Sequence, residues 1–204
     1  MPKIVDPEAR RRDVAEAVFR VVARDGFASA SLRNVADEAG LAIGSVRHYC
    51  GSHEQLMAIA FDALNDSFTA RFMPHVGKVE TTEPRSPERQ ALVEAMLAEF
   101  LPLDEQRTRE IVVWLEFSIA ARGDSRYRPY VRRISSGMRM IVRRILDGSR
   151  DAGQLAGDID LDEETDRLAA LIDGLALTAV TTPEAIPPER TMEVLRAHLG
   201  TLLR

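Results

Sequence analysis

The sequence predicts an all-α protein of nine helices, in which an N-terminal helix-turn-helix head precedes a larger helical bundle. Apolar residues recur at helical spacings of three and four along most of the 204 residues, and no segment alternates as a half-buried strand would. Capping residues, prolines and glycines stand where these periodic segments begin and end. The predicted helices span about 7–25, 31–38, 43–49, 52–72, 87–101, 104–122, 125–152, 162–180 and 189–203.

The first three predicted helices are short and have clear boundary residues. A polar N-cap followed by Pro and an acid begins the first, a serine caps the second, and glycines end all three. Those boundary residues are Asp6, Pro7, Glu8, Gly26, Ser31, Gly40 and Gly51.

The middle of the chain predicts three longer helices and one loop. Ser52-His53-Glu54-Gln55 has the form of a capping box and begins the fourth helix. The Pro/Thr-rich stretch 73–86 predicts a loop. Ser86 and Asp104 cap the fifth and sixth helices. The segment IVVWLEFSIAA of the sixth helix is apolar almost all round, which predicts burial on every side.

The last three predicted helices form the C-terminal part. Residues 125–152 carry apolar side chains at spacing 4-3-4-3-4, which predicts a helix roughly 40 Å long. Asp162 caps the eighth helix. The last two helices have wide apolar faces, which need a partner surface.

Composition excludes several classes of protein. Hydrophobic residues make up 45% and charged residues 29%, which is typical of a chain that buries a core and not of a disordered one. A single cysteine, Cys50, excludes a disulfide framework. No apolar run approaches the roughly 20 residues that cross a bilayer, and the N-terminus lacks the pattern of a signal peptide. The sequence therefore predicts a cytoplasmic protein.

Charge is distributed unevenly along the chain. The net charge of −5 divides into +1 for residues 1–53, which hold eight basic and seven acidic groups, and −6 for the remainder. DNA binding would therefore need basic residues that gather on one face of the N-terminal part. Arginine supplies 25 of the 27 basic residues, and its planar guanidinium suits phosphate and guanine.

The second and third helices have the pattern of a helix-turn-helix. They are short and are joined through Ala39-Gly40-Leu41, and a short helix presented at an angle fits the DNA major groove. Arg47 is the residue best suited to guanine, and Gly44 permits close approach to the DNA backbone. The predicted DNA-contacting residues are Ser31, Arg33, Ile43, Gly44, Ser45, Arg47, His48, Tyr49 and His53.

Three patterns near this motif have more than one interpretation. Arg33 would contact DNA phosphate, which we favour, or pair with Asp37 one turn along. The run Arg10-Arg11-Arg12 with Lys3 is a DNA-reaching arm or a solvated helix face. The spacing His48-x-Cys50-x-x-His53 allows zinc or thiol chemistry, but it supplies no fourth ligand and no orienting group. We therefore expect no metal, no cofactor and no enzyme activity.

The segment SLRNVADEAGLAIGSVRHYCGSHEQLM, residues 31–57, resembles the DNA-binding motif of TetR-family regulators, and its G-S-V-x-H-Y form is similar to the BetI-like branch. IDGLAL, residues 172–177, resembles the eighth helix of that branch. The resemblance implies an all-α homodimer that binds a double-stranded DNA operator as a repressor. It implies release by a small-molecule effector and dimerisation through the last two helices. It divides the chain into a DNA-binding domain, 1–52, and a ligand-binding and dimerisation domain, 53–204.

Four residues depart from the family pattern. Ala42 stands where the family has a Ser or Thr cap, and Arg47 replaces Tyr or Ser, which should change base preference. Cys50 replaces a core Phe, so packing behind the recognition helix would be looser. His53 replaces a phosphate-binding Lys, which would make that contact weaker and pH-sensitive.

The bundle offers a candidate effector pocket, because Met and aromatic side chains form adaptable apolar sites. Glu116 lies in the most apolar helix, so it either pairs with an arginine such as Arg139 or Arg143 or faces the pocket, where it would favour a cationic ligand. The predicted pocket residues are Phe61, Leu64, Phe68, Met96, Phe100, Trp114, Glu116, Phe117, Tyr127 and Met138. The predicted dimer interface comprises Leu168, Leu171, Ile172, Leu175, Val180, Met192, Leu195 and Leu199.

Three other functions compete with a ligand-responsive repressor. A DNA binder without a ligand would have a solid C-terminal core. A dimeric adaptor would bind protein through its head, and a small thiol enzyme would depend on Cys50.

Overall fold

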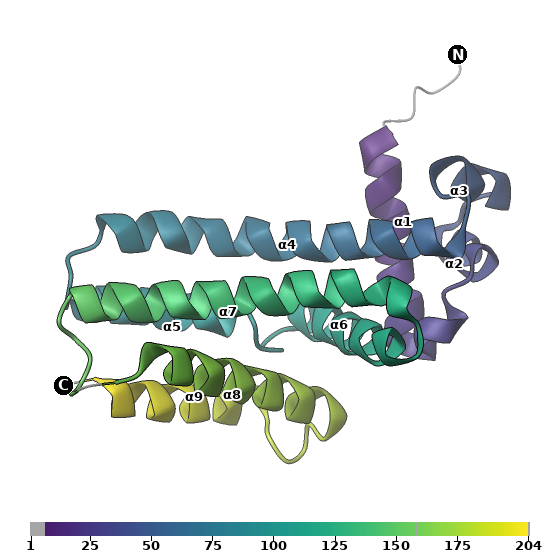
Figure 1. The fold of residues 1–204 in the computed structure, drawn as a ribbon. Helices are drawn as coiled ribbons and strands as arrows, with labels where there is room; N and C mark the ends of the chain where they lie inside the picture. Colours follow the sequence, from purple (N-terminus) through teal and green to yellow (C-terminus); the bar gives the residue numbers. More distant parts are fainter. Residues whose placement is uncertain (1–6, 158, 204) are drawn as a thin grey trace. The chain divides into compact units, whose positions relative to one another are not determined.

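The computed structural model of the protein describes residues 7–157 and 159–203, and these form nine α-helices and two short 3-10 helices (Figure 1). The elements are α1 Pro7–Asp25, η1 Phe27–Ser29, α2 Leu32–Ala39, α3 Ile43–Tyr49, α4 His53–Thr81, α5 Pro87–Ala98, α6 Glu105–Gly123, η2 Ser125–Tyr127, α7 Arg128–Asp151, α8 Leu161–Thr181 and α9 Pro188–Leu202. Extended pairing in the described ranges is limited to one isolated bridge between Leu155 and Leu203. The predicted all-α fold of nine helices is confirmed.

The chain forms two compact units. The first unit comprises the residues as far as Phe68 together with Val112–Tyr130, and the second comprises Thr69–Ile111 and Val131–Arg204. The first unit thus includes the end of α6 and the start of α7 together with the N-terminal head, and the predicted domain boundary at residue 52 stays a prediction. Helices α4, α6 and α7 each contribute residues to both units.

Short-range signals set the boundaries of the helices in the head. The Ser31 hydroxyl accepts the Asn34 N–H at 3.1 Å and caps α2, and Gly40 ends α2 in the left-handed region, with φ of 64°. Helix α1 packs on α2 and α2 on α3. Val18 of α1, Val35 of α2 and Val46 of α3 are fully buried. The predicted boundaries of α2 and α3 therefore hold to within one residue.

Two arginines of α1 fasten it to α2. Arg20 Nε lies 2.7 Å from Glu38 Oε1, and Arg24 donates to Glu38 Oε2 at 2.9 Å. Hydrogen bonds from Arg20 and then Arg24 lower the pKa of the Glu38 carboxyl. These two guanidinium groups therefore serve the head's own structure.

The core of the second unit is built from the inner faces of α5, α7, α8 and α9 and from the segments that follow α5 and α7. Buried members share helical spacing along each element. They are Leu97, Leu101, Met138, Val142, Leu146, Leu155, Leu161, Leu168, Ala169, Ile172, Leu175, Leu195 and Leu202. Helices α8 and α9 lie side by side within this unit (Figure 1).

This core changes the predicted dimer interface. Leu168, Ile172, Leu175 and Leu195 are buried within the single chain, so their side chains offer no surface to a second copy. Leu171, Met192 and Leu199 pack partly against the same core, and Val180 is half-buried. The wide apolar faces of α8 and α9 largely cover each other and α5 and α7. The sequence pattern could not distinguish these partners from a second chain.

Helix α4 is longer than predicted. The expected loop at 73–86 is wrong as far as Thr81, because α4 continues through Pro74. A proline in a helix interior removes one hydrogen bond and costs about 3 kcal/mol. The turns on either side are held in place: Arg71 binds two buried carboxylates, Phe72 is buried, and His75 Nε2 lies 3.4 Å from Glu99. These contacts offset the break.

Two further expectations need correction. The sixth helix is not buried on every side, because Ile119 is 64% exposed. The N-cap of α8 is Asp160 and not Asp162, since Asp160 Oδ1 accepts the N–H groups of Asp162 and Glu163. The N-cap Asp6 and Lys3 lie outside the described residues. In the described ranges, no helix combines the length and apolar character needed to span a membrane.

Candidate nucleic-acid interface

Helix α3 presents one polar face and anchors the opposite one. Val46 is fully buried, whereas Ile43, Gly44, Ser45, Arg47 and His48 are exposed. These five exposed residues are among the predicted DNA contacts, and a recognition helix reaches base edges through exposed side chains of this kind. A buried anchor fixes the angle at which the exposed face is offered to a groove.

The ends of α3 differ in how they are held. Ala42 makes no side-chain cap, as its identity predicts. At the C-terminal end the rings of His48 and Tyr49 meet edge to face with centroids 5.3 Å apart, and Tyr49 is half-buried. His48 is thereby supported at the exposed surface.

Helix α2 and its N-cap carry residues that are predicted to contact the DNA phosphate backbone. Arg33 is exposed, and no hydrogen bond or ion pair joins it to Asp37 among the described residues, so its contact with phosphate stays a prediction. Ser31 uses its oxygen as the N-cap acceptor, and its hydroxyl can still donate to a phosphate. The Arg10-Arg11-Arg12 run lies in α1, where Arg10 pairs with Asp13 at 3.3 Å. This places the run on a helix and not on an extended arm.

The side chain of His53 belongs to an aromatic cluster. Its Nδ1 lies 3.3 Å from the Tyr127 hydroxyl, and its ring meets Phe27 with centroids 5.8 Å apart. Burial, and then the charge of Arg126, lowers the pKa of the imidazole. A neutral, inward-facing ring is a poor phosphate ligand, so the expected pH-sensitive contact is not supported. The backbone amide at the start of α4 remains the better candidate.

Cys50 is a structural residue. Its side chain is fully buried, and Sγ donates to the Val46 carbonyl at 3.2 Å. Burial raises the pKa of the thiol. A buried thiol with a raised pKa is neither a nucleophile nor a redox switch at neutral pH. No group of three or more metal-binding side chains occurs in the described part of the chain.

The predicted effector residues fall into both units. Phe61, Leu64, Phe117 and Tyr127 are buried in the first unit, together with the half-buried Phe68, Trp114 and Glu116. Met96, Phe100 and Met138 belong to the second unit, and Phe100 and Met138 pack in its core or against it. In the first unit the rings contact one another: Phe61 meets Phe117 at 5.9 Å, and Phe117 meets Tyr127 at 6.2 Å. These side chains therefore make a packed cluster.

Glu116 has a partner that the sequence did not suggest. Its Oε2 accepts the backbone N–H of Phe27 at 3.0 Å. The expected partners bind elsewhere: Arg139 pairs with Asp166, and Arg143 pairs with Asp147 and Asp162. Phe27 itself was missed as a functional candidate, because a single aromatic residue after a glycine carries no periodic signal.

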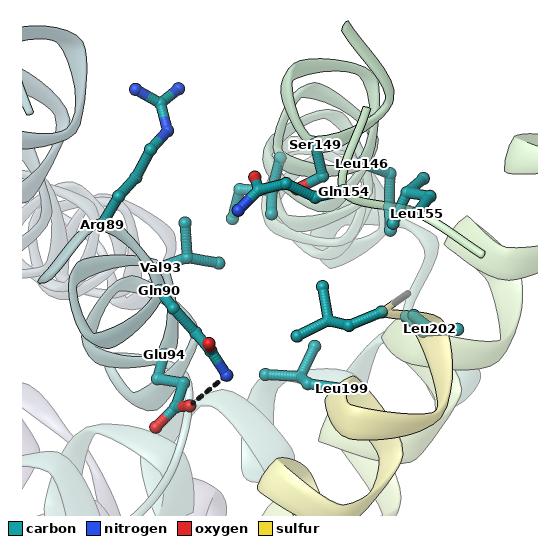
Figure 2. A pocket seen from close by; sticks show the side chains of 12 residues that line it. Arg89, Gln90, Val93, Glu94, Leu146, Ser149, Gln154, Leu155, Leu199 and Leu202 are labelled. Atoms are coloured by element: carbon teal, nitrogen blue, oxygen red, sulfur yellow. Dashed lines mark hydrogen bonds between the residues drawn. The ribbon is translucent and has the colours of Figure 1, made fainter. Parts of the chain in front are cut away.

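The described residues of the second unit line a small cleft and a larger one. The smaller, about 40 Å³, is surrounded by α5, α7 and α9, with Val93, Leu146 and Leu199 gathered around it (Figure 2). That volume holds water and not an effector. The larger, about 440 Å³, is lined by residues of α8, α9 and the preceding loop, including Glu164 and His198. None of the ten predicted effector residues lines either cleft.

A helix-turn-helix head with an exposed recognition helix, carried by an all-helical chain, defines a class of DNA-binding transcriptional regulators. Comparison with known proteins identifies the family. Residues 89–204 match the C-terminal domain of BetI-type transcriptional repressors. The chain is 34% identical over 203 residues to the HTH-type transcriptional regulator PksA of Bacillus subtilis, covering 99% of this chain and 94% of the relative. The protein belongs to the BetI-type repressors of the TetR family, and it is a regulator and not an enzyme.

Solved structures agree on the fold. A transcriptional regulator from Rhodococcus sp. Rha1 superposes with a TM-score of 0.76 at 29% identity, over 97% of this chain and 96% of that one. A transcriptional regulator from Saccharomonospora viridis, solved in complex with choline, superposes with a TM-score of 0.76 at 21% identity, over 97% of this chain and 99% of that one.

Proposed function

We propose that the protein represses transcription by binding a pseudo-palindromic DNA operator as a homodimer, and that a small-molecule effector releases it. The observation that carries the DNA-binding step is the recognition helix α3, with Val46 buried and five residues exposed on the other face. Two such helices in one dimer would enter successive major grooves about one helical turn apart.

The proposed contacts divide by role. Arg47 would read guanine through its guanidinium, and Ile43, which is 40% exposed, would contact a thymine methyl group. Ser31 and Arg33 would bind phosphate and fix the register, as would the backbone amide of His53. Ser45 and Tyr49 would add hydrogen bonds, while Gly44 keeps the helix close to the DNA.

The proposed dimer uses the outer faces of α8 and α9. Small exposed residues there allow two helices to approach closely, and Leu177 adds an apolar side chain that is 47% exposed. The proposed surface comprises Ala170, Gly174, Leu177, Ala197 and Gly200, which are all exposed. Leu177→Glu should therefore yield monomers in sedimentation equilibrium, whereas the matched Met140→Glu, at an exposed site on α7, should leave the dimer unchanged.

The effector is proposed on family membership. Residues 89–204, which match the BetI-type domain, include the larger cleft. Its volume of about 440 Å³ falls in the range of roughly 300–1,000 Å³ usual for small-molecule sites. Choline is the first probe, because a protein of the same fold was solved with it. Binding would raise the unfolding temperature with increasing choline.

Selection of bound duplexes from a random pool tests the DNA-binding step. An enriched inverted repeat bound with steep salt dependence is the expected result. Arg47→Ala should lose about 1–3 kcal/mol and relax the preference at one base pair per half-site. Arg33→Ala should weaken all sequences alike and lower the salt slope by about one. Arg122→Ala, at an exposed position of α6, is the control and should change neither. A folded dimer that enriches no sequence would contradict the proposal.

A further inference from the structure

The Glu116 side chain of helix α6 is hydrogen-bonded to the turn between α1 and α2 of the DNA-binding head. Glu116 Oε2 accepts the Phe27 N–H at 3.0 Å, a contact between residues 89 positions apart. Gly26, directly before, has φ of 81°, a value that favours glycine and sharpens the turn between α1 and η1. Within the described part of the chain Glu116 is the acceptor recorded for this N–H, which lies at a half-buried position.

The choice of a carboxylate at this position is informative. Glu116 sits in the most apolar stretch of α6, where a charged group costs free energy unless it is hydrogen-bonded. Within the described ranges no arginine, lysine or histidine pairs with it, and its recorded bond is to the Phe27 backbone. A charge-assisted hydrogen bond is stronger than one between neutral groups. The carboxylate is therefore assigned to the turn and not to an ion pair.

Aromatic contacts reinforce the same junction. The Phe27 ring meets Phe117, the residue after Glu116, with centroids 5.1 Å apart. It also meets Tyr127 at 5.1 Å and His53 at 5.8 Å, all three edge to face. Backbone and side chain of Phe27 are thus both fixed by α6 and its neighbours in the first unit.

Hydrogen bonds also join the η1 turn to α2. The Ser29 hydroxyl donates to the Asp25 carbonyl at 2.8 Å, and Asn34 of α2 donates from Nδ2 to the Ser29 carbonyl at 2.8 Å. Asn34 also donates its N–H to Ser31 Oγ. A displacement of Phe27 would therefore carry α2, and with it the helix-turn-helix.

We propose that Glu116 is the positioning residue through which α6 sets the orientation of the helix-turn-helix. Movement of α6 changes the bond at Phe27, and the η1 turn passes that change to α2. This inference rests on the proposed function, because its consequence is the gain or loss of operator binding. The bond itself is tested without DNA.

Hydrogen exchange of the free protein tests the bond. Glu116→Ala should speed exchange of the Phe27 amide by roughly tenfold or more, since the amide loses its acceptor. Glu116→Gln keeps an acceptor oxygen of the same reach and should speed it by a smaller factor. Glu105→Gln, an exposed carboxylate on the same helix, is the control and should have no effect. If the alanine variant does not fold, the glutamine variant decides. Exchange equal to wild type in the folded variants overturns the proposal.

Operator binding tests the coupling. Trp114, the chain's single tryptophan, lies in α6 two residues before Glu116 and is half-buried. Operator DNA should shift its emission in the wild type, and an unrelated duplex should not. Glu116→Ala should bind operator roughly tenfold more weakly. At saturating operator the emission shift should be absent, which a loss of stability alone would not cause.

The outcomes separate the two proposals. A wild type that binds no sequence while Phe27 exchange responds to Glu116 overturns the proposed function and leaves the bond established. Operator binding with an unchanged tryptophan shift in Glu116→Ala keeps the proposed function and overturns the coupling.

Discussion

Arg71 binds two carboxylates that are largely shielded from solvent. Its guanidinium donates to Glu110 at 2.9 and 2.7 Å and to Glu99 at 2.8 Å. The Glu110 side chain is 7% exposed and that of Glu99 is 12% exposed. Burial alone would lower the pKa of Arg71, but its bonds to Glu110 and Glu99 raise it overall, so the cation persists at every accessible pH.

Arg71→Ala should destabilise the protein severely. It removes the cation and leaves two carboxylates buried, which costs about 3–5 kcal/mol when one partner of a buried pair is deleted. Arg107, 3.8 Å from Glu99, compensates only part of this. For a chain of this length each kcal/mol lowers the unfolding temperature by roughly 2–4 °C, so we expect a fall of roughly 6–20 °C.

Circular dichroism during heating measures the change, with all variants at one protein concentration because the proposed dimerisation would make the unfolding temperature concentration-dependent. Arg109→Ala is the matched control: its partner Glu105 is exposed, and such a pair contributes about 0.3–0.5 kcal/mol. A second test replaces Arg71, Glu99 and Glu110 together with Met or Leu, which should recover most of the stability. A loss below about 1 kcal/mol in Arg71→Ala would refute the reasoning.

Three more predictions concern single residues. Burial lowers the pKa of His53 in the folded protein below 6.5. The stability that His53 contributes is therefore present above pH 6.5 and is lost as the pH falls through its pKa in the folded protein. His53→Gln should flatten the plot of unfolding temperature against pH between 7 and 5, and curves identical to wild type would contradict this. Pro74→Ala restores a backbone N–H inside α4 and should raise the free energy of unfolding, measured with urea, by about 1–3 kcal/mol. A lower free energy of unfolding in this variant would show that the proline is required. Burial raises the pKa of Cys50, so a thiol reagent should label the folded protein roughly 100-fold more slowly than the unfolded one, and equal rates would show an open site.

Local chemistry made the head predictable from sequence. Ser31 at the start of α2 and Gly40 at its end act through backbone groups within four residues, and the structure shows both roles. The recognition helix runs over Ile43–Tyr49 as predicted because Val46 alone fills its inner face. Both partners of such a local interaction lie within one short stretch of sequence, so the sequence alone predicts it.

Partners distant in sequence were not predictable. An apolar stripe on α8 shows that Leu168 and Ile172 need cover, but it cannot state whether the cover is α9 or a second chain. Pro74 predicts a break, and the contacts that Arg71, Phe72 and His75 make with distant residues explain why α4 continues. Glu116 needed a hydrogen-bond donor. The 25 arginines of the sequence were the expected donors, and nothing in the sequence pointed to the backbone N–H of Phe27.

The two internal carboxylates of α6 show how one helix can serve both stability and regulation. Glu110 belongs to the second unit and binds Arg71, whereas Glu116 belongs to the first and binds the Phe27 amide. They are six residues apart on one helix, roughly 9 Å along its axis. The variants should separate. Removing the partner of Glu110 lowers stability, whereas removing Glu116 frees the turn and changes operator binding more than the unfolding temperature.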